Sequence, residues 1–258
     1  MTVGDEQFLY RYRHLQGEHR EWTKRILTDS ILYFASPSTF NDPFDCKVHF
    51  RSSFSTKELK HKYADLVRQF RPQLNRSQRK TKVARDVNSI NKKEFQSNMT
   101  RRLQDATESL GILSFSGTAR NILLWSHYAS GHTGICLKFL AGPHTPFFGY
   151  AQPLEYTSDY PEINLLDPPD RQVQAFLLTK ASDWQYEQEW RIIDHDHGKG
   201  DRVFPEELLV EVILGARMQR EDKEAVAVWV HKRKTPVKLS EARVGSGSFL
   251  LDIVPYVP

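Results

Sequence analysis

The apolar residues of this chain gather in short runs rich in β-forming side chains, and these runs constrain the fold more than any other feature. They are too short for typical helices and are bounded by turn-forming residues, which is typical of buried strands. Apolar residues at helical spacing separate some of these runs but not all of them. The Gly-rich turns of a doubly wound parallel sheet are also missing. The runs cover residues 31–35, 112–116, 134–139 and 208–214.

Further segments complete the expected α+β fold, a single mixed α/β domain over residues 1–258 with a split or strongly curved sheet. Asn121 is placed to cap a helix that contains Leu124 and Trp125, and Gly131 is placed to end it. Additional strands are predicted at residues 8–13, 154–157, 187–193, 237–244 and 249–254. Additional helices are predicted at residues 18–29, 172–180 and 220–232.

A basic segment interrupts this pattern and is predicted to be an α-helical insertion over residues 55–105. Between Lys57 and Asp105 the chain has 14 Lys or Arg against 5 Asp or Glu, whereas the whole chain has a net charge of +4. Two sets of apolar residues at helical spacing predict two helices. The surplus charge indicates either a patch for nucleic acid or another polyanion, or a solvated helical face. The two sets are Leu59, Tyr63, Leu66, Val67, Phe70 and Leu74, and Val83, Val87, Ile90, Phe95, Met99 and Leu103.

Several classes of protein are disfavoured by what the sequence lacks. No apolar run approaches the ~18 residues of a membrane span, and the first residues do not resemble a signal peptide. Cys46 and Cys136 do not make a disulfide framework or a zinc site on their own. No phosphate-binding Gly-rich motif, zinc-protease motif or serine-hydrolase elbow occurs. A cytoplasmic location with no membrane partner is therefore expected.

The segment 184–191, Trp-Gln-Tyr-Glu-Gln-Glu-Trp-Arg, is the strongest candidate for chemistry. In a strand, residues two apart point to the same side. If residues 187–193 are extended, Glu187 and Glu189 share a face with Arg191. The pattern fits either a catalytic pair of carboxylates or an exposed strand with a ladder of salt bridges.

Arg11 and Arg13 also alternate along a predicted strand. A buried guanidinium needs partners for its donors, and phosphate suits its geometry well. The alternative is pairing with a structural carboxylate such as Asp42 or Asp45.

Three weaker signals accompany these pairs. Ser114 and Ser116 share one face of a predicted strand, where hydroxyl groups can hold a ligand or orient a carboxylate. Asp42 and Asp45 can serve as metal ligands, although an Asn-Asp-Pro turn more commonly bonds to itself. His127 is a possible base, but no acidic or nucleophilic partner is adjacent in the sequence.

On several of these stretches the chain resembles a widespread bacterial family catalogued as domain of unknown function 2971. The resemblance implies no defined activity, but it is compatible with a role in phage defence or in a toxin system. The matching stretches are residues 9–13, 40–45, 124–129, 134–139 and 180–191.

The order of arginine, Ser-x-Ser and Glu-x-Glu along the chain also resembles the arrangement in ADP-ribosyltransferases. This likeness implies that NAD is a substrate and that no metal is required. It implies that Arg11 or Arg13 holds the NAD phosphates or the nicotinamide ribose, and that Ser114 and Ser116 support the site.

The same resemblance assigns the carboxylates. Glu189 would be the catalytic acid and Glu187 the residue that faces the acceptor substrate, while Tyr128 is one of the aromatics that can stack on nicotinamide or adenine. Carboxylates suit this reaction because cleavage of the nicotinamide–ribose bond passes through an oxocarbenium-like state.

Two other functions remain open. A metal-dependent nuclease would use Asp42, Asp45, Glu187 and Glu189 and grip nucleic acid with the basic segment. A non-catalytic module would bind nucleic acid or a protein acceptor through residues 55–105. The leading prediction is an NAD-consuming ADP-ribosyltransferase or NAD glycohydrolase.

Overall fold

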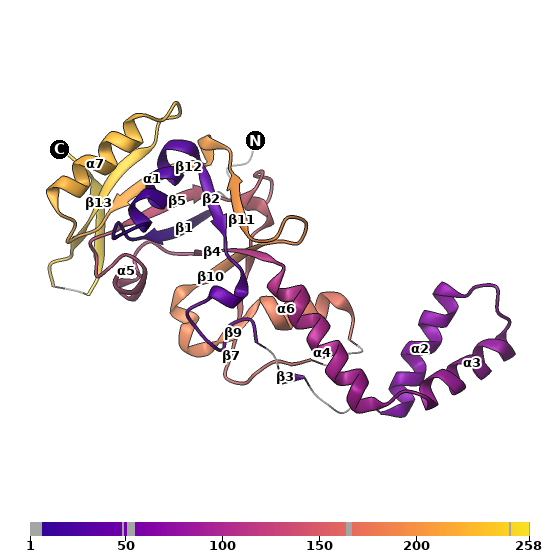
Figure 1. Cartoon of the computed structure of the whole chain (residues 1–258). Coiled ribbons are helices and arrows are strands. Elements are labelled where there is room, and N and C mark those ends of the chain that lie inside the picture. The colour runs from indigo at the N-terminus through magenta and orange to yellow at the C-terminus, as the bar shows by residue number, and fades with distance from the viewer. Residues whose placement is uncertain (1–6, 48, 51–54, 164–166, 248, 258) are drawn as a thin grey trace, which may run out of the picture. The chain divides into compact units, whose positions relative to one another are not determined.

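The computed structural model describes residues 7–47, 49–50, 55–163, 167–247 and 249–257. Its helices and strands form an α+β fold (Figure 1), which confirms the predicted class. Contacts divide the chain into two compact units. We call residues 1–41, 109–156 and 182–258 the sheet unit, and residues 42–108 and 157–181 the helical unit.

The sheet unit is built on a mixed sheet in which the described residues form eight strands, in the order β14-β13-β12-β5-β1-β4-β10-β6. Strands β12 and β13 are parallel, and the other neighbours are antiparallel. The strands are β1 (Phe8–Arg13), β4 (Gly111–Ser116), β5 (Ile135–Leu140), β6 (Gln152–Pro153), β10 (Glu189–Asp194), β12 (Leu209–Leu214), β13 (Lys238–Val244) and β14 (Leu251–Pro255).

The sheet is nearly split between β1 and β4, as the sequence led us to expect. In the described part of the chain, these two strands share one registered pair, Tyr10 with Ser116. By contrast, β1 and β5 share six pairs, and β4 and β10 share six pairs. The ladder that joins β1 to β4 is therefore much shorter than the ladders on either side of it.

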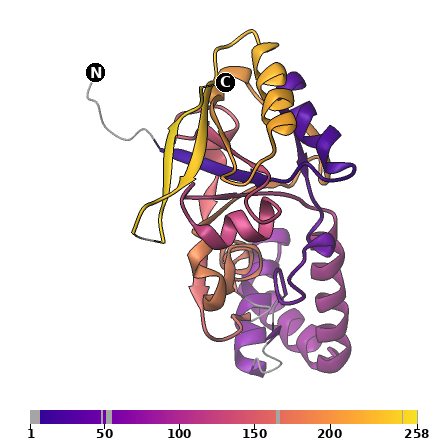
Figure 2. The ribbon, with the colours of Figure 1, turned by 90° about the vertical axis from the view of Figure 1, so that its left-hand side faces the viewer.

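Helices cover both faces of this sheet (Figures 1 and 2). Helices α1 (His19–Asp29) and α7 (Arg220–His231) lie side by side and pack on one face. Alternate apolar residues of the central strands point into this core, among them Leu9, Leu113, Phe115, Leu137, Phe139 and Val212. We call this the α1 face.

The opposite face is covered in part by the short helix α5 (Ile122–Tyr128), and we call it the α5 face. Trp125 of α5 is fully buried and meets Tyr12 of β1 edge to face, with 5.2 Å between ring centroids. As predicted, Asn121 caps the helix: its side-chain oxygen accepts from the backbone N–H groups of Leu123 at 2.8 Å and Leu124 at 3.4 Å. Gly131 follows the helix with a φ of 63°, a left-handed conformation that glycine adopts readily.

In the helical unit, the basic segment forms helices α2 (Thr56–Phe70), α3 (Arg76–Asn88) and α4 (Lys92–Glu108). The prediction of two helices was wrong, because the chain breaks a second time between α3 and α4. Pro72 follows α2, and Asn75 then starts a new helix by accepting from the backbone N–H of Gln78 at 2.9 Å. The second apolar set is divided between α3 and α4.

The core of α2 and α3 uses only part of the predicted apolar set. Leu59, Val67, Val83 and Val87 are buried, with Tyr63 packed against them. Phe70 is exposed, because it lies in the last turn of α2 where the chain leaves the helix pair. The helical unit also contains a parallel pair between β3 (His49–Phe50) and β8 (Glu162–Ile163), and helix α6 (Pro169–Leu177).

The remaining elements are short. Strands β2 (Ile31–Phe34) and β11 (Gly200–Val203) form an antiparallel pair in the sheet unit. Strands β7 (Glu155–Thr157) and β9 (Thr179–Ala181) and the 3₁₀ helices η1 (Pro37–Thr39), η2 (Phe148–Tyr150), η3 (Ser182–Glu187) and η4 (Glu206–Leu208) complete the described structure. Among the described residues, no helix has the length and apolar character needed to cross a membrane.

Candidate functional site

A continuous row of polar side chains crosses the α5 face of the sheet, and we call it the polar row. Registered partners on neighbouring strands share a face. The pairs Glu189–Ser116, Ser116–Tyr10, Tyr10–Lys138, Lys138–Glu211 and Glu211–Lys238 therefore line up across β10, β4, β1, β5, β12 and β13. A row of this kind is unusual on a sheet face that also carries the buried Tyr12, Cys136 and Ile213.

Glu189 forms one end of the polar row, and its carboxylate is held in a fixed position. Arg191, two residues along β10 and fully buried, donates from Nε at 2.7 Å and from Nη2 at 3.2 Å. The backbone N–H of Glu189 donates to the hydroxyl of Tyr156 at 2.7 Å. A carboxylate offers about four acceptor positions, and the two bonds from Arg191 fix the direction of this one.

Glu187 does not lie on the strand with Glu189, contrary to the prediction. It ends the 3₁₀ helix η3, and Gln188 then adopts a left-handed conformation with a φ of 46°. The turn nevertheless brings the buried Glu187 side chain to α5, where the Tyr128 hydroxyl donates to Oε1 at 2.8 Å. Both carboxylates therefore belong to the α5 side of the sheet.

Ser116 connects the two acidic residues. Its hydroxyl donates to the carbonyl oxygen of Glu187 at 2.6 Å, and the residue itself is the registered partner of Glu189. Ser114 points to the same face, where its registered partner is Arg191. The structure therefore brings together five of the predicted site residues, namely Glu187, Glu189, Ser114, Ser116 and Tyr128.

The two predicted arginines project in the other direction. Arg11 and Arg13 alternate with Tyr10 and Tyr12, so they point to the α1 face together with Leu9. Arg13 lies near α1, with Nε 3.5 Å from the Thr23 hydroxyl and Nη2 3.5 Å from Nδ1 of His19. These contacts place Arg13 on the α1 side of the strand.

Arg11 links β1 to β4 through its side chain. Its Nη1 donates to the carbonyl oxygen of Ser114 at 2.6 Å, and its guanidinium lies 5.8 Å from the centre of the Phe115 ring. Burial and the charge of Arg13 lower the pKa of Arg11, whereas the charge of Glu189 acts to raise it. Arg11 is therefore within electrostatic reach of Glu189 even though it points to the opposite face.

Other predicted candidates have local structural roles. Asp42 accepts from the backbone N–H of Phe44 at 2.9 Å, which is the self-bonded turn expected for this loop, and Asp45 forms an ion pair with Lys180 at 3.6 Å. Both belong to the helical unit. His127 is exposed on α5, with its ring 6.5 Å from that of Tyr186. Within the part of the chain that the structure describes, no three His, Cys, Asp or Glu side chains form a group able to hold a metal ion.

The other end of the polar row was missed by the sequence analysis. Glu211 is buried and accepts from the Ser240 hydroxyl at 2.6 Å, with Lys238 at 3.1 Å and Lys138 at 3.7 Å. Burial acts to raise the pKa of Glu211, but the hydrogen bond from Ser240 and the charges of the two lysines outweigh it. The net shift of the pKa is downward, so the carboxyl group stays ionised. A signal was present, because Lys138 and Glu211 are single charged residues in otherwise apolar strands, where a charge needs a partner.

Comparisons with known proteins match one region of the chain. The model of a family described as "Protein of unknown function (DUF2971)" matches residues 124–192. Neither the curated proteins nor the solved structures contained a match. The matched region includes Tyr128, Glu187, Glu189 and Arg191, so the acidic end of the polar row lies in the part of the chain that is similar to the DUF2971 family.

Proposed function

We propose that this chain is an NAD-consuming enzyme, an ADP-ribosyltransferase or NAD glycohydrolase, that uses Glu189 and Glu187. The observation that carries the proposal is a pair of buried acidic residues on the α5 side of the sheet. Ser116 donates to the backbone carbonyl of Glu187 and is the registered partner of Glu189, and Tyr128 donates to the Glu187 carboxylate. Carboxylates in a site of low water content stabilise positive charge more strongly than in bulk water.

In the proposed reaction, the bond between the nicotinamide nitrogen and the ribose carbon breaks, and nicotinamide leaves with the bonding electrons. Positive charge then develops on the ribose. Glu189 accepts a hydrogen bond from a ribose hydroxyl and so stabilises this charge; Arg191 keeps the carboxylate in place but reduces its net charge. We therefore assign Glu189 a role in hydrogen bonding rather than in proton removal.

We assign Glu187 the role of the base. The neutral hydroxyl of Tyr128 donates to its Oε1 at 2.8 Å and helps to orient the carboxylate. In the proposed mechanism Glu187 takes the proton from water or from an acceptor hydroxyl as that oxygen adds to the ribose. The aromatic ring of Tyr128 is then close to the reacting groups.

The direct test is release of nicotinamide from NAD, measured by chromatography for the full chain without added metal. We expect Glu189→Gln to reduce the rate at least about 100-fold, the size of effect seen when a group that stabilises the transition state is removed. Because this change disturbs the ion pair with Arg191, the double variant Glu189→Gln/Arg191→Met, which removes both charges, serves as a second arm.

The control is Glu224→Gln, which removes an exposed carboxylate of α7. All variants are first checked for folding by circular dichroism. Absence of nicotinamide release by the wild-type chain, or an unchanged rate in a folded Glu189→Gln variant, would contradict the proposal. A cytoplasmic toxin or phage-defence effector would be a natural setting for such an activity.

A second candidate function is nucleic-acid binding by the helical unit. The observation that favours it is the exposure of many basic side chains on α2 and α3, among them Lys57, Lys60, Arg68, Arg76, Lys80 and Arg85. Part of this charge is neutralised within the helices, since Arg68 pairs with Asp65 and Arg85 with Asp86. The two functions are compatible if nucleic acid is the acceptor.

A further inference from the structure

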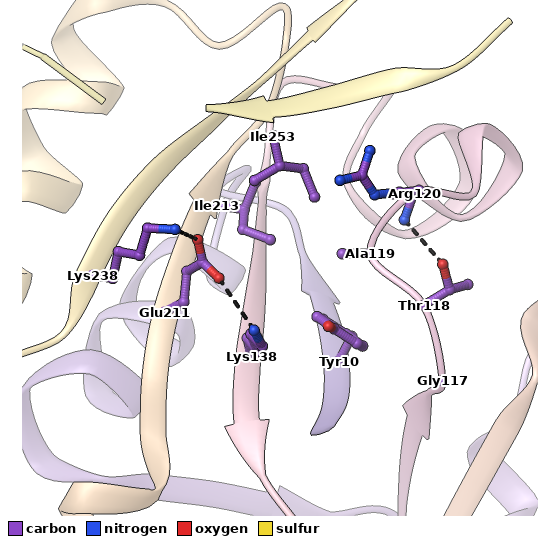
Figure 3. Close-up of a pocket in the computed structure, with 10 residues that line it drawn as sticks. All are labelled: Tyr10, Gly117, Thr118, Ala119, Arg120, Lys138, Glu211, Ile213, Lys238 and Ile253. Carbon is purple, nitrogen blue, oxygen red and sulfur yellow. Dashed lines mark hydrogen bonds and ion pairs between the residues drawn. The ribbon is translucent and has the colours of Figure 1, made fainter. Parts of the chain in front are cut away.

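A pocket of about 290 Å³ lies over the basic end of the polar row (Figure 3). Four row members line it: Tyr10, Lys138, Glu211 and Lys238. The loop 117–120, which follows Ser116 directly, forms one side of the pocket and contributes Arg120. The pocket is therefore linked to the acidic end of the row in two ways. Registered strand pairs join the two ends, and the loop 117–120 continues directly from Ser116.

Positive charge predominates in this pocket. Arg120, Lys138 and Lys238 line it together with one carboxylate, that of Glu211. Both lysines lie against this carboxylate, with Lys238 Nζ at 3.1 Å and Lys138 Nζ at 3.7 Å. One carboxylate cannot neutralise three cations, so the pocket has a surplus of positive charge that suits an anion carrying more than one negative charge.

The cations are positioned on different sides of the space. Figure 3 shows Arg120 and Lys238 on opposite sides, with Lys138 and Tyr10 below them. Arg120 Nη1 donates to the carbonyl oxygen of Leu251 at 2.9 Å, which fixes the direction of its guanidinium. A guanidinium has five N–H donors, so this bond commits only one of them.

The remaining walls of the pocket are apolar. Ile213 and Ile253 lie between the two sides, and the ring of Tyr10 forms part of the floor. A ligand that fits such walls has a flat or apolar part in addition to its anionic groups. Inorganic ions alone would leave these walls uncovered.

We propose that this pocket binds the diphosphate of a nucleotide, with Arg120, Lys138 and Lys238 as its cationic contacts. The assignment to NAD rests on the proposed function, whereas diphosphate binding does not. Lys138 and Glu189 are separated by three strand intervals on the same face, which at about 4.8 Å per interval places their backbones roughly 14 Å apart.

The proposal also accounts for the orientation of the arginines on β1. Arg11 and Arg13 point to the α1 face, so they do not line the face on which Ser116 and Glu189 lie. That face carries Arg191, which pairs with Glu189, and also Lys138 and Lys238, with Arg120 on the adjoining loop. Phosphate recognition would thus use residues far apart in the sequence.

The test is direct binding of ADP to the full chain by titration calorimetry at low salt, with pyrophosphate and adenosine as separate arms. We expect ADP and pyrophosphate to bind and adenosine to bind at least about tenfold more weakly than ADP. The double variant Arg120→Gln/Lys238→Gln should raise the Kd for ADP at least about tenfold, because each removes a charge-assisted contact. Both residues are exposed at the rim, so the fold should tolerate the change.

The matched control is Lys199→Gln, which removes one positive charge from an exposed position between β10 and β11. Unchanged ADP affinity in the double variant, or equal affinity for adenosine and ADP, would overturn the assignment of the pocket. If ADP binding depends on Arg120 and Lys238 but NAD is not cleaved, the pocket stands and the proposed function fails. If NAD is cleaved and the double variant binds ADP normally, only the pocket assignment fails.

Discussion

Arg191 donates to both carboxylate oxygens of Glu189, from Nε at 2.7 Å and from Nη2 at 3.2 Å, and both side chains are almost completely buried. Removal of one partner takes an ion pair and two hydrogen bonds away from a charge that stays buried. The pair is therefore expected to contribute strongly to stability in addition to any catalytic role.

We predict that Arg191→Met lowers the free energy of unfolding by about 3–5 kcal/mol, as is typical when a buried ion pair is broken. The measurement is urea denaturation followed by circular dichroism. The control is Arg220→Met, which breaks an exposed pair with Glu224 on α7 and should change stability by less than about 1 kcal/mol. Equal effects of the two substitutions would contradict the structural role of the buried pair.

The second prediction concerns Glu211 and pH. Because the folded protein lowers the pKa of Glu211, its ionised form favours folding. This contribution is complete above the ordinary glutamate pKa of about 4.3 and is lost as the pH falls through the lower pKa of the folded state. Denaturation curves of Glu211→Gln should therefore show a smaller loss of stability than wild type as the pH is lowered from 6 toward about 3.

Ser240→Ala tests the cause of that shift. The Ser240 hydroxyl donates to Glu211 at 2.6 Å and is one of the groups that lower its pKa. We expect this variant to have an intermediate dependence of stability on pH. A dependence identical to wild type in both variants would show that Glu211 does not titrate as described.

The third prediction separates Arg11 from Arg13. Arg11 donates to the backbone carbonyl oxygen of Ser114 at 2.6 Å, whereas the contacts of Arg13 with Thr23 and His19 are both 3.5 Å long. Arg11→Met should lower the free energy of unfolding by about 1–3 kcal/mol, because the carbonyl oxygen of Ser114 loses this hydrogen-bond donor. Arg13→Met should lower the free energy of unfolding by a smaller amount. The denaturation midpoints of the two variants measure the difference.

The fourth prediction concerns the basic helices. If α2 and α3 bind nucleic acid, affinity for a labelled single-stranded oligonucleotide should fall steeply with salt. Replacing Lys57, Lys60, Arg76 and Lys80 by Gln should weaken binding and reduce the salt dependence. The same variant should release nicotinamide at the wild-type rate if the chemistry belongs to the sheet unit. Fluorescence anisotropy and chromatography measure the two properties.

The parts of the fold that sequence predicted well are those set by local signals. The Asn121 cap, the apolar stripe of α1 and the apolar runs of β4 and β5 each depend on neighbouring residues. The α3–α4 boundary was missed because apolar residues at roughly helical spacing continue across residues 89–91.

The site was harder to predict because it depends on register between distant strands. The i, i+2 spacing of Glu187 and Glu189 led us to place both residues on one strand. The sequence does not reveal the left-handed conformation of Gln188, which separates Glu187 from β10. Alternation also gave no indication that Arg11 faces away from Ser116, because the relation between β1 and β4 is set by the pair Tyr10–Ser116. Lys138 and Glu211 become a site only when β5 and β12 are paired.

The near-split between β1 and β4 has a mechanical consequence. One registered pair joins two half-sheets that are each held internally by longer ladders, so this seam should open more readily than the neighbouring strand pairs. Tyr10 and Ser116 sit on that seam, midway along the polar row. Breathing motions at the seam would therefore lengthen or shorten the distance from the basic pocket to Glu189, and amide exchange near Ser116 should respond to ADP.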